Sequence, residues 1–268
     1  MKKVKVLVIG NWKVYIETRN EATLLARAMK KLSGSNPLCD VVIAPPFPHV
    51  SLVASALKQT HVRVGAQTLS ASAAGAHTGE VTAVMLKDAG ASFVIVGHSE
   101  RRAAGETSAI ISEKISAALR HGIRVVLCIG ELERSEDSEN STYFEYINEQ
   151  LHASLEGVSQ KDSAKIIVAY EPVWAIGKNG EDAVKPAALR EVAIFIRKTL
   201  VGMFGRGAAL KIPIIYGGSV DSYNVGVLST EGGVQGFLVG RASTDAKKFG
   251  ELLAAIGRAQ TLSTGKKK

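Results

Sequence analysis

Several kinds of residue are scarce in this sequence of 268 residues, and each shortage excludes a class of protein. The two cysteines, Cys39 and Cys128, are too few for the disulfide framework that holds many small secreted domains together. No apolar run approaches the ~20 residues that a membrane-spanning helix needs. Aromatic residues make up 6% of the chain, and none of them form a stripe with lysine or arginine, so a nucleic-acid-binding surface is not indicated.

Two signatures of cofactor-dependent enzymes are also missing. The sequence has no cluster of residues at metal-ligand spacing and no dinucleotide-binding fingerprint, so we expect neither a metal nor an organic cofactor. A signal peptide is not expected either, because Lys5 interrupts the first apolar run and residues 11–13, Asn-Trp-Lys, end it. These absences predict a soluble, cytoplasmic protein of a reducing compartment.

The charge of the chain is clearly positive. Lysine and arginine number 33 against 25 acidic residues, which gives a formal net charge of +8. Part of this excess lies in residues 262–268, which we expect to form a flexible basic tail. The charge permits an anionic partner, and a small anionic substrate fits as well as a nucleic acid. Binding to DNA or RNA would show itself as an affinity that falls steeply with salt.

Short apolar runs alternate with amphipathic stretches along the whole sequence, of which 46% is hydrophobic. The expected strands are residues 4–9, 40–44, 61–65, 93–96, 124–129, 165–169, 212–216 and 235–239. The expected helices lie near residues 17–32, 50–59, 81–89, 108–121, 142–155, 186–204, 222–228 and 246–259. Continuous apolar strands in repeated strand–helix order indicate a parallel sheet covered by helices. Eight such units predict an α/β fold, a single-domain (β/α)8 barrel over residues 1–268.

A carboxylate stands where the sixth predicted strand ends. Glu171 is followed by Pro172, which steers it away from helical geometry and holds it in an extended conformation. The next four residues, 173–176, are Val-Trp-Ala-Ile, which is unusually apolar for a loop and is typical of a lid that closes over a site. The alternative interpretation of this stretch alone is a structural turn with a surface glutamate.

Other polar and glycine residues follow other predicted strands. Asn11 and Lys13 come after the first strand, and His98 and Glu100 come after the fourth. Because active sites of (β/α)8 barrels gather at the carboxyl ends of the strands, these residues are expected to meet in space. The seventh and eighth strands are followed by glycine-containing turns, Gly217-Gly218-Ser219 and Gly240-Arg241.

Four motifs carry a family resemblance: Gly-His-Ser-Glu-Arg-Arg at 97–102, Gly-Asn-Trp-Lys at 10–13, Tyr-Glu-Pro-Val-Trp-Ala-Ile-Gly at 170–177 and Tyr-Gly-Gly-Ser-Val at 216–220. Together they closely resemble the triosephosphate isomerase family. Shorter matches at 65–67, 79–80, 85–88 and 128–131 extend the resemblance almost from end to end. It implies an isomerase of glycolysis and gluconeogenesis that interconverts dihydroxyacetone phosphate and D-glyceraldehyde 3-phosphate.

The resemblance also implies catalytic roles. Glu171 would be the base that moves a proton between two adjacent carbons, and an apolar lid would strengthen it by removing water. His98 would be the neutral electrophile at a helix N-terminus, where the helix dipole disfavours the cation. A lone histidine is ordinarily a packed or surface residue; the setting of His98 reverses that expectation. Lys13 would stabilise the enediolate and the phosphate. Asn11 would donate its amide to a substrate oxygen and help to orient Lys13. Glu100 would pair with Lys13 or carry a proton, whereas Arg102 is expected to be structural.

Phosphate binding is assigned to backbone N–H groups of glycine-rich loops. By resemblance these belong to Gly177, Ser219, Gly240 and Arg241. The family commonly has a second glycine where this chain has Arg241, so its side chain either points away or adds charge near the phosphate. The lid also departs from the family, because the segment from Lys178 to Lys185 is longer than usual.

The loop from Gly75 to Thr78 is expected to join two subunits into a homodimer. It lies in a long stretch of small residues, and in the family this loop reaches the neighbouring subunit. Thr78 would then lie near Asn11 of the partner subunit. The family usually has phenylalanine where this chain has His77.

Two alternative functions fit parts of this pattern. One is a barrel that acts on a different phosphorylated sugar or an indole-type substrate, and the other is a catalytically silent phosphate-binding scaffold. The joint presence of Asn11, Lys13, His98 and Glu171 argues against both.

Overall fold

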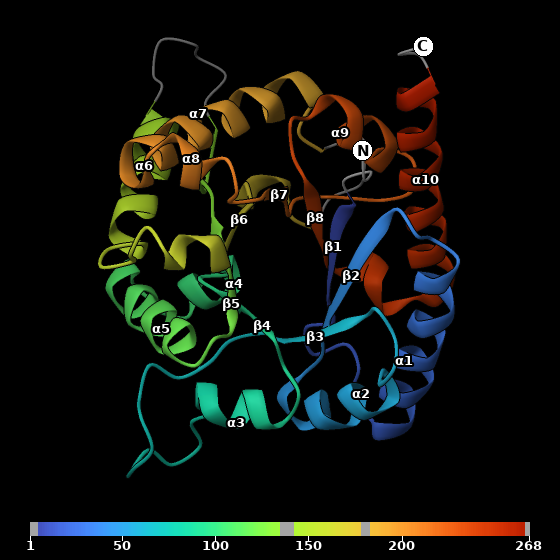
Figure 1. Ribbon diagram of the computed structural model, residues 1–268, viewed down its shortest axis with the longest axis horizontal. Coiled ribbons are helices and arrows are strands. Elements are labelled where there is room, and N and C mark those ends of the chain that lie inside the picture. Colours follow the sequence, from blue (N-terminus) through green and yellow to red (C-terminus); the bar gives the residue numbers. More distant parts are fainter. Residues whose placement is uncertain (1–4, 135–141, 178–182, 266–268) are drawn as a thin grey trace.

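The computed structural model describes residues 5–134, 142–177 and 183–265. Its strands form a closed parallel barrel in which each strand pairs with the next and β8 pairs with β1, and its helices surround the strands (Figure 1). The strands are β1 Val6–Asn11, β2 Cys39–Ala44, β3 Arg63–Ala66, β4 Phe93–Val96, β5 Arg124–Ile129, β6 Ile166–Tyr170, β7 Ile214–Tyr216 and β8 Gly236–Val239. The predicted (β/α)8 barrel is therefore confirmed.

The helices that cover the barrel follow their strands in chain order. They are α1 Arg19–Gly34, α2 Val50–Ala56, α3 Ala83–Asp88, α4 Ser99–Ala103, α5 Ser108–Arg120, α6 Thr142–Ser154, α7 Pro186–Phe204, α8 Arg206–Ala209, α9 Val225–Glu231 and α10 Ala246–Gly265. Short 3₁₀ turns occur at η1 Phe47–His49, η2 Asp162–Lys165, η3 Val173–Ala175 and η5 Arg241–Thr244. Within the described residues, none of these helices is both long and apolar enough to cross a membrane.

Several element ends differ from the sequence-based expectations. β1 ends at Asn11 rather than at Ile9, so Asn11 belongs to the strand instead of following it. The short helices α4 and α8 were not predicted, because four or five residues are too few to show a helical period. At the other end of the chain, α10 continues to Gly265, so residues 262–265 lie in a helix rather than in the expected tail. Adding residues to an existing helix is easier than starting one, which explains this extension. Residues 266–268 lie outside the described residues.

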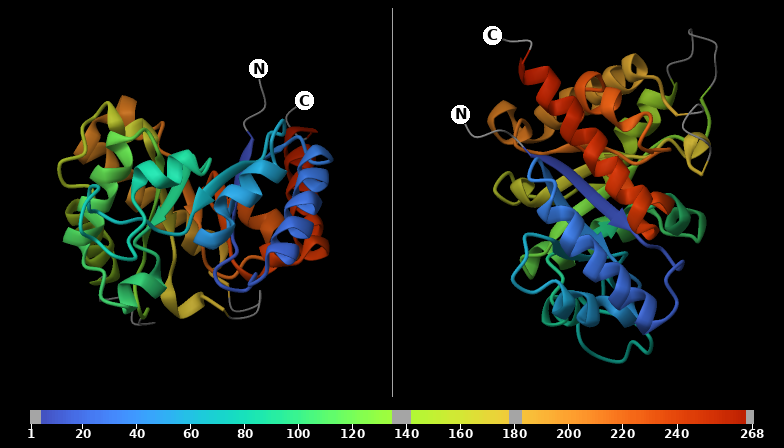
Figure 2. Two further views of the ribbon diagram at one scale, coloured as in Figure 1. Left: turned by 90° about the horizontal axis from the view of Figure 1, so that it is seen from below. Right: turned by 90° about the vertical axis from the view of Figure 1, so that its right-hand side faces the viewer.

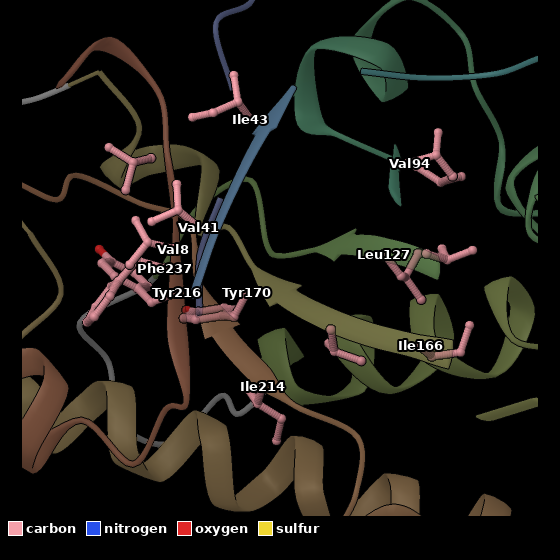
Figure 3. Packing of buried hydrophobic residues seen from close by; sticks show 14 of the residues in the cluster. Val8, Val41, Ile43, Val94, Leu127, Ile166, Tyr170, Ile214, Tyr216 and Phe237 are labelled. Atoms are coloured by element: carbon pink, nitrogen blue, oxygen red, sulfur yellow. The ribbon is translucent and has the colours of Figure 1, made fainter. Parts of the chain in front are cut away.

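The core has two layers separated by the wall of the barrel. Strand side chains of one parity, with Val8, Val94 and Phe237 among them, pack against helix residues in the outer layer, part of which is drawn in Figure 3. Strand side chains of the other parity form a second cluster that contains no helix residue, as expected for the interior of a closed barrel. This inner cluster consists of Leu7, Ile9, Val42, Ala44, Phe93, Ile95, Val126, Cys128, Ile167, Ala169, Ile215 and Leu238.

The long connection between β3 and α3 leaves the body of the barrel. Residues 73–80 are all exposed, and the loop projects beyond the neighbouring helices in two of the views (teal in Figures 1 and 2). The loop from Gly75 to Thr78, expected at a subunit interface, belongs to this exposed segment.

Candidate active site

The alternation of side chains along each strand decides which residues reach the mouth of the barrel. On β1, Leu7 and Ile9 point into the barrel, so Asn11 continues on the inner side. On β6, Ile167 and Ala169 point inward, and Glu171 is the next residue of the same parity. The same count places Gly217 after β7 and Gly240 after β8 on the inner side. Residues from distant parts of the chain are thereby aimed at one place.

His98 has the opposite parity to the inner residues of β4 and reaches the site by a change of backbone direction. Gly97 has φ +73°, a conformation that glycine adopts without strain. A Cβ atom there would lie 3.0 Å from Ile111 and 3.2 Å from the Cys128 carbonyl, so the space is closed as well. Arg102 donates hydrogen bonds to the carbonyls of Gly97 (3.0 Å) and Cys128 (3.3 Å), the structural role expected of it.

These side chains line one cavity of about 450 Å³ at the carboxyl ends of the strands. The cavity contains all the site residues predicted from the sequence except Glu100. The predicted residues along its wall are Asn11, Lys13, His98, Glu171, Gly177, Ser219, Gly240 and Arg241.

Glu171 is held in this cavity almost out of contact with water. It is 3% exposed, and its Oε1 lies 3.5 Å from His98 Nε2. Its Oε2 is buried and makes no hydrogen bond with any described residue. Gly217 and Gly130 make room for it: a Cβ at Gly217 would lie 2.6 Å from Glu171 Cγ, and one at Gly130 would lie 2.0 Å from the Glu171 carbonyl oxygen. A buried carboxylate with a free oxygen is a good candidate for a base.

The hydrogen bonding of His98 favours a neutral ring. His98 is the N-cap of α4, and its Nδ1 accepts a hydrogen bond of 3.2 Å from the Glu100 backbone N–H. An Nδ1 that accepts a hydrogen bond carries no proton, so the ring proton resides on Nε2, the nitrogen that faces Glu171. A second proton on Nδ1 would place two N–H groups against each other and break this contact.

Lys13 is held in a strained backbone conformation with φ 47°. Its N–H donates to Asn11 Oδ1 (3.0 Å), and its carbonyl accepts a hydrogen bond from Gln67 Nε2 (2.8 Å). Its ammonium lies 2.5 Å from Glu100 Oε1, which is one of the two roles expected for Glu100. Left-handed backbone in a residue other than glycine costs about 1–3 kcal/mol and occurs often at functional sites.

A buried carboxylate, Glu131, holds the first residues of the lid by hydrogen bonds. Glu131 Oε1 accepts hydrogen bonds from Tyr170 Oη (2.8 Å) and Trp174 Nε1 (3.0 Å). Arg134 stacks on the Trp174 ring, with 5.7 Å between the guanidinium carbon and the ring centroid. Burial raises the pKa of the Tyr170 hydroxyl far above its usual value, with the charge of Glu131 adding to the effect. The Tyr170 hydroxyl therefore remains a donor.

Two further hydrogen bonds join the lid to the loop region around β7. Ser219 Oγ donates to the Ala175 carbonyl (2.7 Å), and the Val184 N–H donates to Tyr216 Oη (3.3 Å). Both ends of the lid are thus tied to the same strand end. Of the segment from Lys178 to Lys185, which we expect to be longer than usual, residues 178–182 lie outside the described residues.

Sequence reasoning gave no role to two residues that touch the site. Gln67 also donates to the Ala44 carbonyl (3.0 Å) and so joins β2 to the Lys13 turn. Cys128 lies on the inner face of β5, where burial and then the charge of Glu171 raise the pKa of its thiol well above the usual value. Their place in the strand alternation, on the inner side of the barrel, could have marked them. Strands that are apolar throughout do not reveal which side chains point inward.

Comparison with known proteins decides the family. The family model described as triosephosphate isomerase matches residues 6–256. The chain belongs to the triosephosphate isomerase family. It is therefore an aldose–ketose isomerase by class.

Relatives in this family match over nearly their whole length. The triosephosphate isomerase of Porphyromonas gingivalis is 40% identical over 254 residues, which is 94% of this chain and 99% of that protein. The triosephosphate isomerase of Rhodopirellula baltica is 41% identical over 253 residues, or 94% of this chain and 97% of that protein. The crystal structure of the enzyme from Bartonella henselae superposes with a TM-score of 0.80 at 33% identity and covers 94% of this chain and 99% of that one.

Among the described residues, no group of three or more His, Cys, Asp or Glu side chains is placed to hold a metal ion. The chemistry available in the cavity is that of a buried carboxylate, an imidazole, a lysine and backbone amides. This set can move protons and bind an anion.

Proposed function

We propose that this enzyme interconverts dihydroxyacetone phosphate and D-glyceraldehyde 3-phosphate through an enediolate, with Glu171 as the base and His98 as the electrophile. The observation that carries the proposal is the 3.5 Å separation of Glu171 Oε1 and His98 Nε2 inside one cavity. A substrate in contact with both groups would present a carbon to one of them and an oxygen to the other. The names of the relatives agree with this reaction.

The first step removes a proton from the carbon beside the carbonyl group. The Glu171 carboxylate takes the proton, and the electrons of the broken C–H bond form the C=C bond of the enediolate. The carbonyl electrons move onto oxygen, where the His98 Nε2–H donates a hydrogen bond to the developing charge. General-base catalysis of this kind contributes about 10²–10⁴-fold to the rate.

The second step returns the proton to the neighbouring carbon. Before this, one hydroxyl proton must move between the two enediol oxygens, and His98 Nε2 can give a proton to one oxygen while it takes one from the other. Throughout the cycle His98 passes between neutral and anionic forms, which the hydrogen bond from the Glu100 N–H to Nδ1 permits. No redox cofactor or metal takes part in this balance.

Lys13 and Asn11 complete the electrostatic environment. The Lys13 ammonium lines the cavity and lies against Glu100, so it can shift toward an arriving phosphate or enediolate without leaving the site. Asn11 fixes the backbone of Lys13 through its Oδ1. We assign phosphate binding to the backbone N–H groups of Gly177, Ser219, Gly240 and Arg241, all of which line the cavity.

The proposal includes a homodimer formed through the loop from Gly75 to Thr78. Its support is the exposure of this loop and of large apolar side chains nearby in sequence: Val84 is 54% exposed and Met85 is 56% exposed on α3. Val14, which follows Lys13, is 77% exposed. Such exposed apolar groups are typical of an interface. Sedimentation equilibrium at micromolar concentration should give twice the mass of the chain, and a monomer mass would refute the dimer.

The deciding experiment is a coupled assay on purified protein. Glyceraldehyde 3-phosphate is supplied, and the dihydroxyacetone phosphate formed is reduced by an added dehydrogenase that consumes NADH. We expect saturable turnover that 2-phosphoglycolate inhibits competitively. Absence of turnover with this substrate, in a protein that is folded by circular dichroism, would contradict the proposed function. A place in glycolysis and gluconeogenesis, and a location in the cytoplasm, are proposed with this reaction.

A further inference from the structure

Two cationic side chains line the same cavity beyond the reacting centre. Arg241 begins η5 directly after Gly240, and Lys248 lies in the first turn of α10. Both residues are exposed, and the rest of η5 and the start of α10 lie between them in the sequence. They come from different elements, yet both contribute to the wall that also holds the expected phosphate donors.

Neither cation is neutralised by the part of the chain that the structure describes. The Arg241 guanidinium and the Lys248 ammonium make no hydrogen bond or ion pair with a described residue, whereas Lys13, the third cation of the cavity, is paired with Glu100. An unpaired guanidinium in a concave site is available to an anion, because its planar fork matches two phosphate oxygens.

Three carboxylates also line the cavity, and they limit where an anion can sit. Glu171 lies at the reacting centre. Asp221 is occupied by its own turn, since its Oδ1 accepts the backbone N–H groups of Tyr223 and Asn224. Glu251 lies on α10 three residues after Lys248, and it would repel an anion that moved further along the helix. Of the charged side chains along the cavity, Arg241 and Lys248 therefore remain available to a second anion.

The size of the cavity exceeds the needs of a three-carbon monophosphate. Its volume of about 450 Å³ lies within the range of about 300–1,000 Å³ that holds drug-sized ligands. The assigned phosphate donors are backbone groups, so the side chains of Arg241 and Lys248 are left over once one phosphate is bound.

We propose that Arg241 and Lys248 form a second anion subsite beside the phosphate cradle, so that the active site binds small molecules with two phosphate groups more tightly than monophosphates. Such a bisphosphate would place one group in the cradle and the other against the two cations, and it would compete with the substrate. The subsite deepens the proposed function, on which its competition with substrate rests.

The test measures binding by isothermal titration calorimetry, which does not depend on turnover. The probes are methylphosphonate and a series of bisphosphonates with one, two or three methylene groups between the phosphorus atoms. At least one bisphosphonate should bind the unaltered enzyme about tenfold more tightly than methylphosphonate, the gain expected from a charge-assisted bidentate contact.

Substitutions of the two cations test the subsite, and Lys247→Ala serves as the matched control. Lys248→Ala should weaken the bisphosphonate preference and leave the affinity for methylphosphonate within about twofold. Combined with Arg241→Met, it should abolish the preference. Lys247→Ala removes an equal charge from the same turn of α10, but Lys247 does not line the cavity, so the preference should remain. Arg241→Lys keeps the charge without the fork and should retain part of the preference.

Three results would overturn the subsite. They are an unaltered enzyme that binds no bisphosphonate more tightly than methylphosphonate, a double variant that keeps the preference, and a Lys247→Ala loss equal to that of Lys248→Ala. Failure of the proposed function looks different, because the coupled assay would then show no turnover while the bisphosphonate preference persisted. Conversely, normal turnover without the preference would refute the subsite alone.

Discussion

Glu171 and Glu106 are both buried glutamates, at 3% and 7% exposed, yet their surroundings differ completely. Glu106 Oε1 lies 2.5 Å from Lys114 Nζ and 2.7 Å from Arg101 Nε, and Lys114 also donates to Thr68 Oγ1 (3.1 Å). This cluster joins α5 and the α4 turn to the loop after β3. Glu171 has the imidazole of His98 at 3.5 Å and an oxygen without a hydrogen-bond partner among the described residues.

The difference shows that the neighbours of a buried carboxylate, rather than its burial, decide what it does. Burial by itself would raise the pKa of Glu106, but the hydrogen bonds from Lys114 and Arg101 outweigh it and hold the pKa below its usual value. The charge of Glu106 therefore serves to hold α4, α5 and the loop after β3 together. The charge of Glu171 has no cation bonded to it and remains available to a substrate proton.

The largest effect is expected from Glu171→Gln. The amide keeps the shape of the side chain but cannot take a proton, so kcat in the coupled assay should fall by about 10²–10⁴-fold or more. The free energy of unfolding should stay the same or rise, because an incompletely paired buried charge is removed. A kcat within tenfold of the unaltered enzyme would remove Glu171 from the role of base.

Glu106→Gln should have the opposite profile. It leaves the Lys114 ammonium, whose side chain is 9% exposed, without its counter-charge, and breaking a buried pair costs about 3–5 kcal/mol of stability. Urea unfolding measures this loss, and kcat of the folded fraction should change far less than in Glu171→Gln. The control is Asp162→Asn, which breaks an exposed pair with Lys165 and should alter stability little. If Asp162→Asn lowered the stability as much as Glu106→Gln, the stabilising role of the buried Glu106 pair would be contradicted.

Gly217→Ala tests whether the position of Glu171, and not only its chemistry, matters. The added Cβ would lie 2.6 Å from Glu171 Cγ, so the carboxylate must move. A misplacement of about 1 Å can cost about 10²-fold in rate, and we expect a loss in kcat of this order. Gly207→Ala is the control, because a Cβ there meets no atom within 4 Å. An unchanged kcat in Gly217→Ala would mean that the base tolerates displacement.

The smallest effect is a difference in pH dependence. A carboxyl group whose pKa is lower in the folded state than in the unfolded state stabilises the fold above its unfolded pKa, and this stability is lost as pH falls through the folded pKa. Stability of the unaltered enzyme should therefore decline on acidification below the usual pKa of glutamate. Glu106→Gln should show a shallower decline over the same range. Parallel curves in thermal unfolding at stepped pH would assign the acid sensitivity to other groups.

The sequence predicted the barrel and the site residues for different reasons. Repeated apolar runs with β-branched residues predicted the strands, because strands buried on both faces must be apolar throughout. The same property hid the inward parity, so the contacts of Gln67 and Cys128 could not be predicted. His98 was predicted through its motif, whereas the turn at Gly97 that aims it inward depends on a backbone φ angle that the sequence does not reveal.

The paired cluster around Glu106 was missed altogether. Arg101 lies on α4, Lys114 lies on α5, and Glu106 lies in the connection between them. An isolated charge in an amphipathic stretch usually lies on a solvated face. Only the packing of α5 against the loop after β3 buries these charges together. By contrast, pairing with Lys13 was one of the two roles that the family resemblance implied for Glu100, and the structure places the two groups together.

The left-handed backbone at Lys13 lowers the stability of the protein while it keeps the lysine side chain at the cavity. In a Lys13→Gly variant, glycine would adopt φ 47° without strain. The substitution should therefore recover part of the strain energy that the backbone now carries at this position. It would also delete the ammonium that faces the substrate cavity. Selection for heat resistance alone would thus favour a substitution that leaves the barrel intact and removes the cation proposed to act on the substrate.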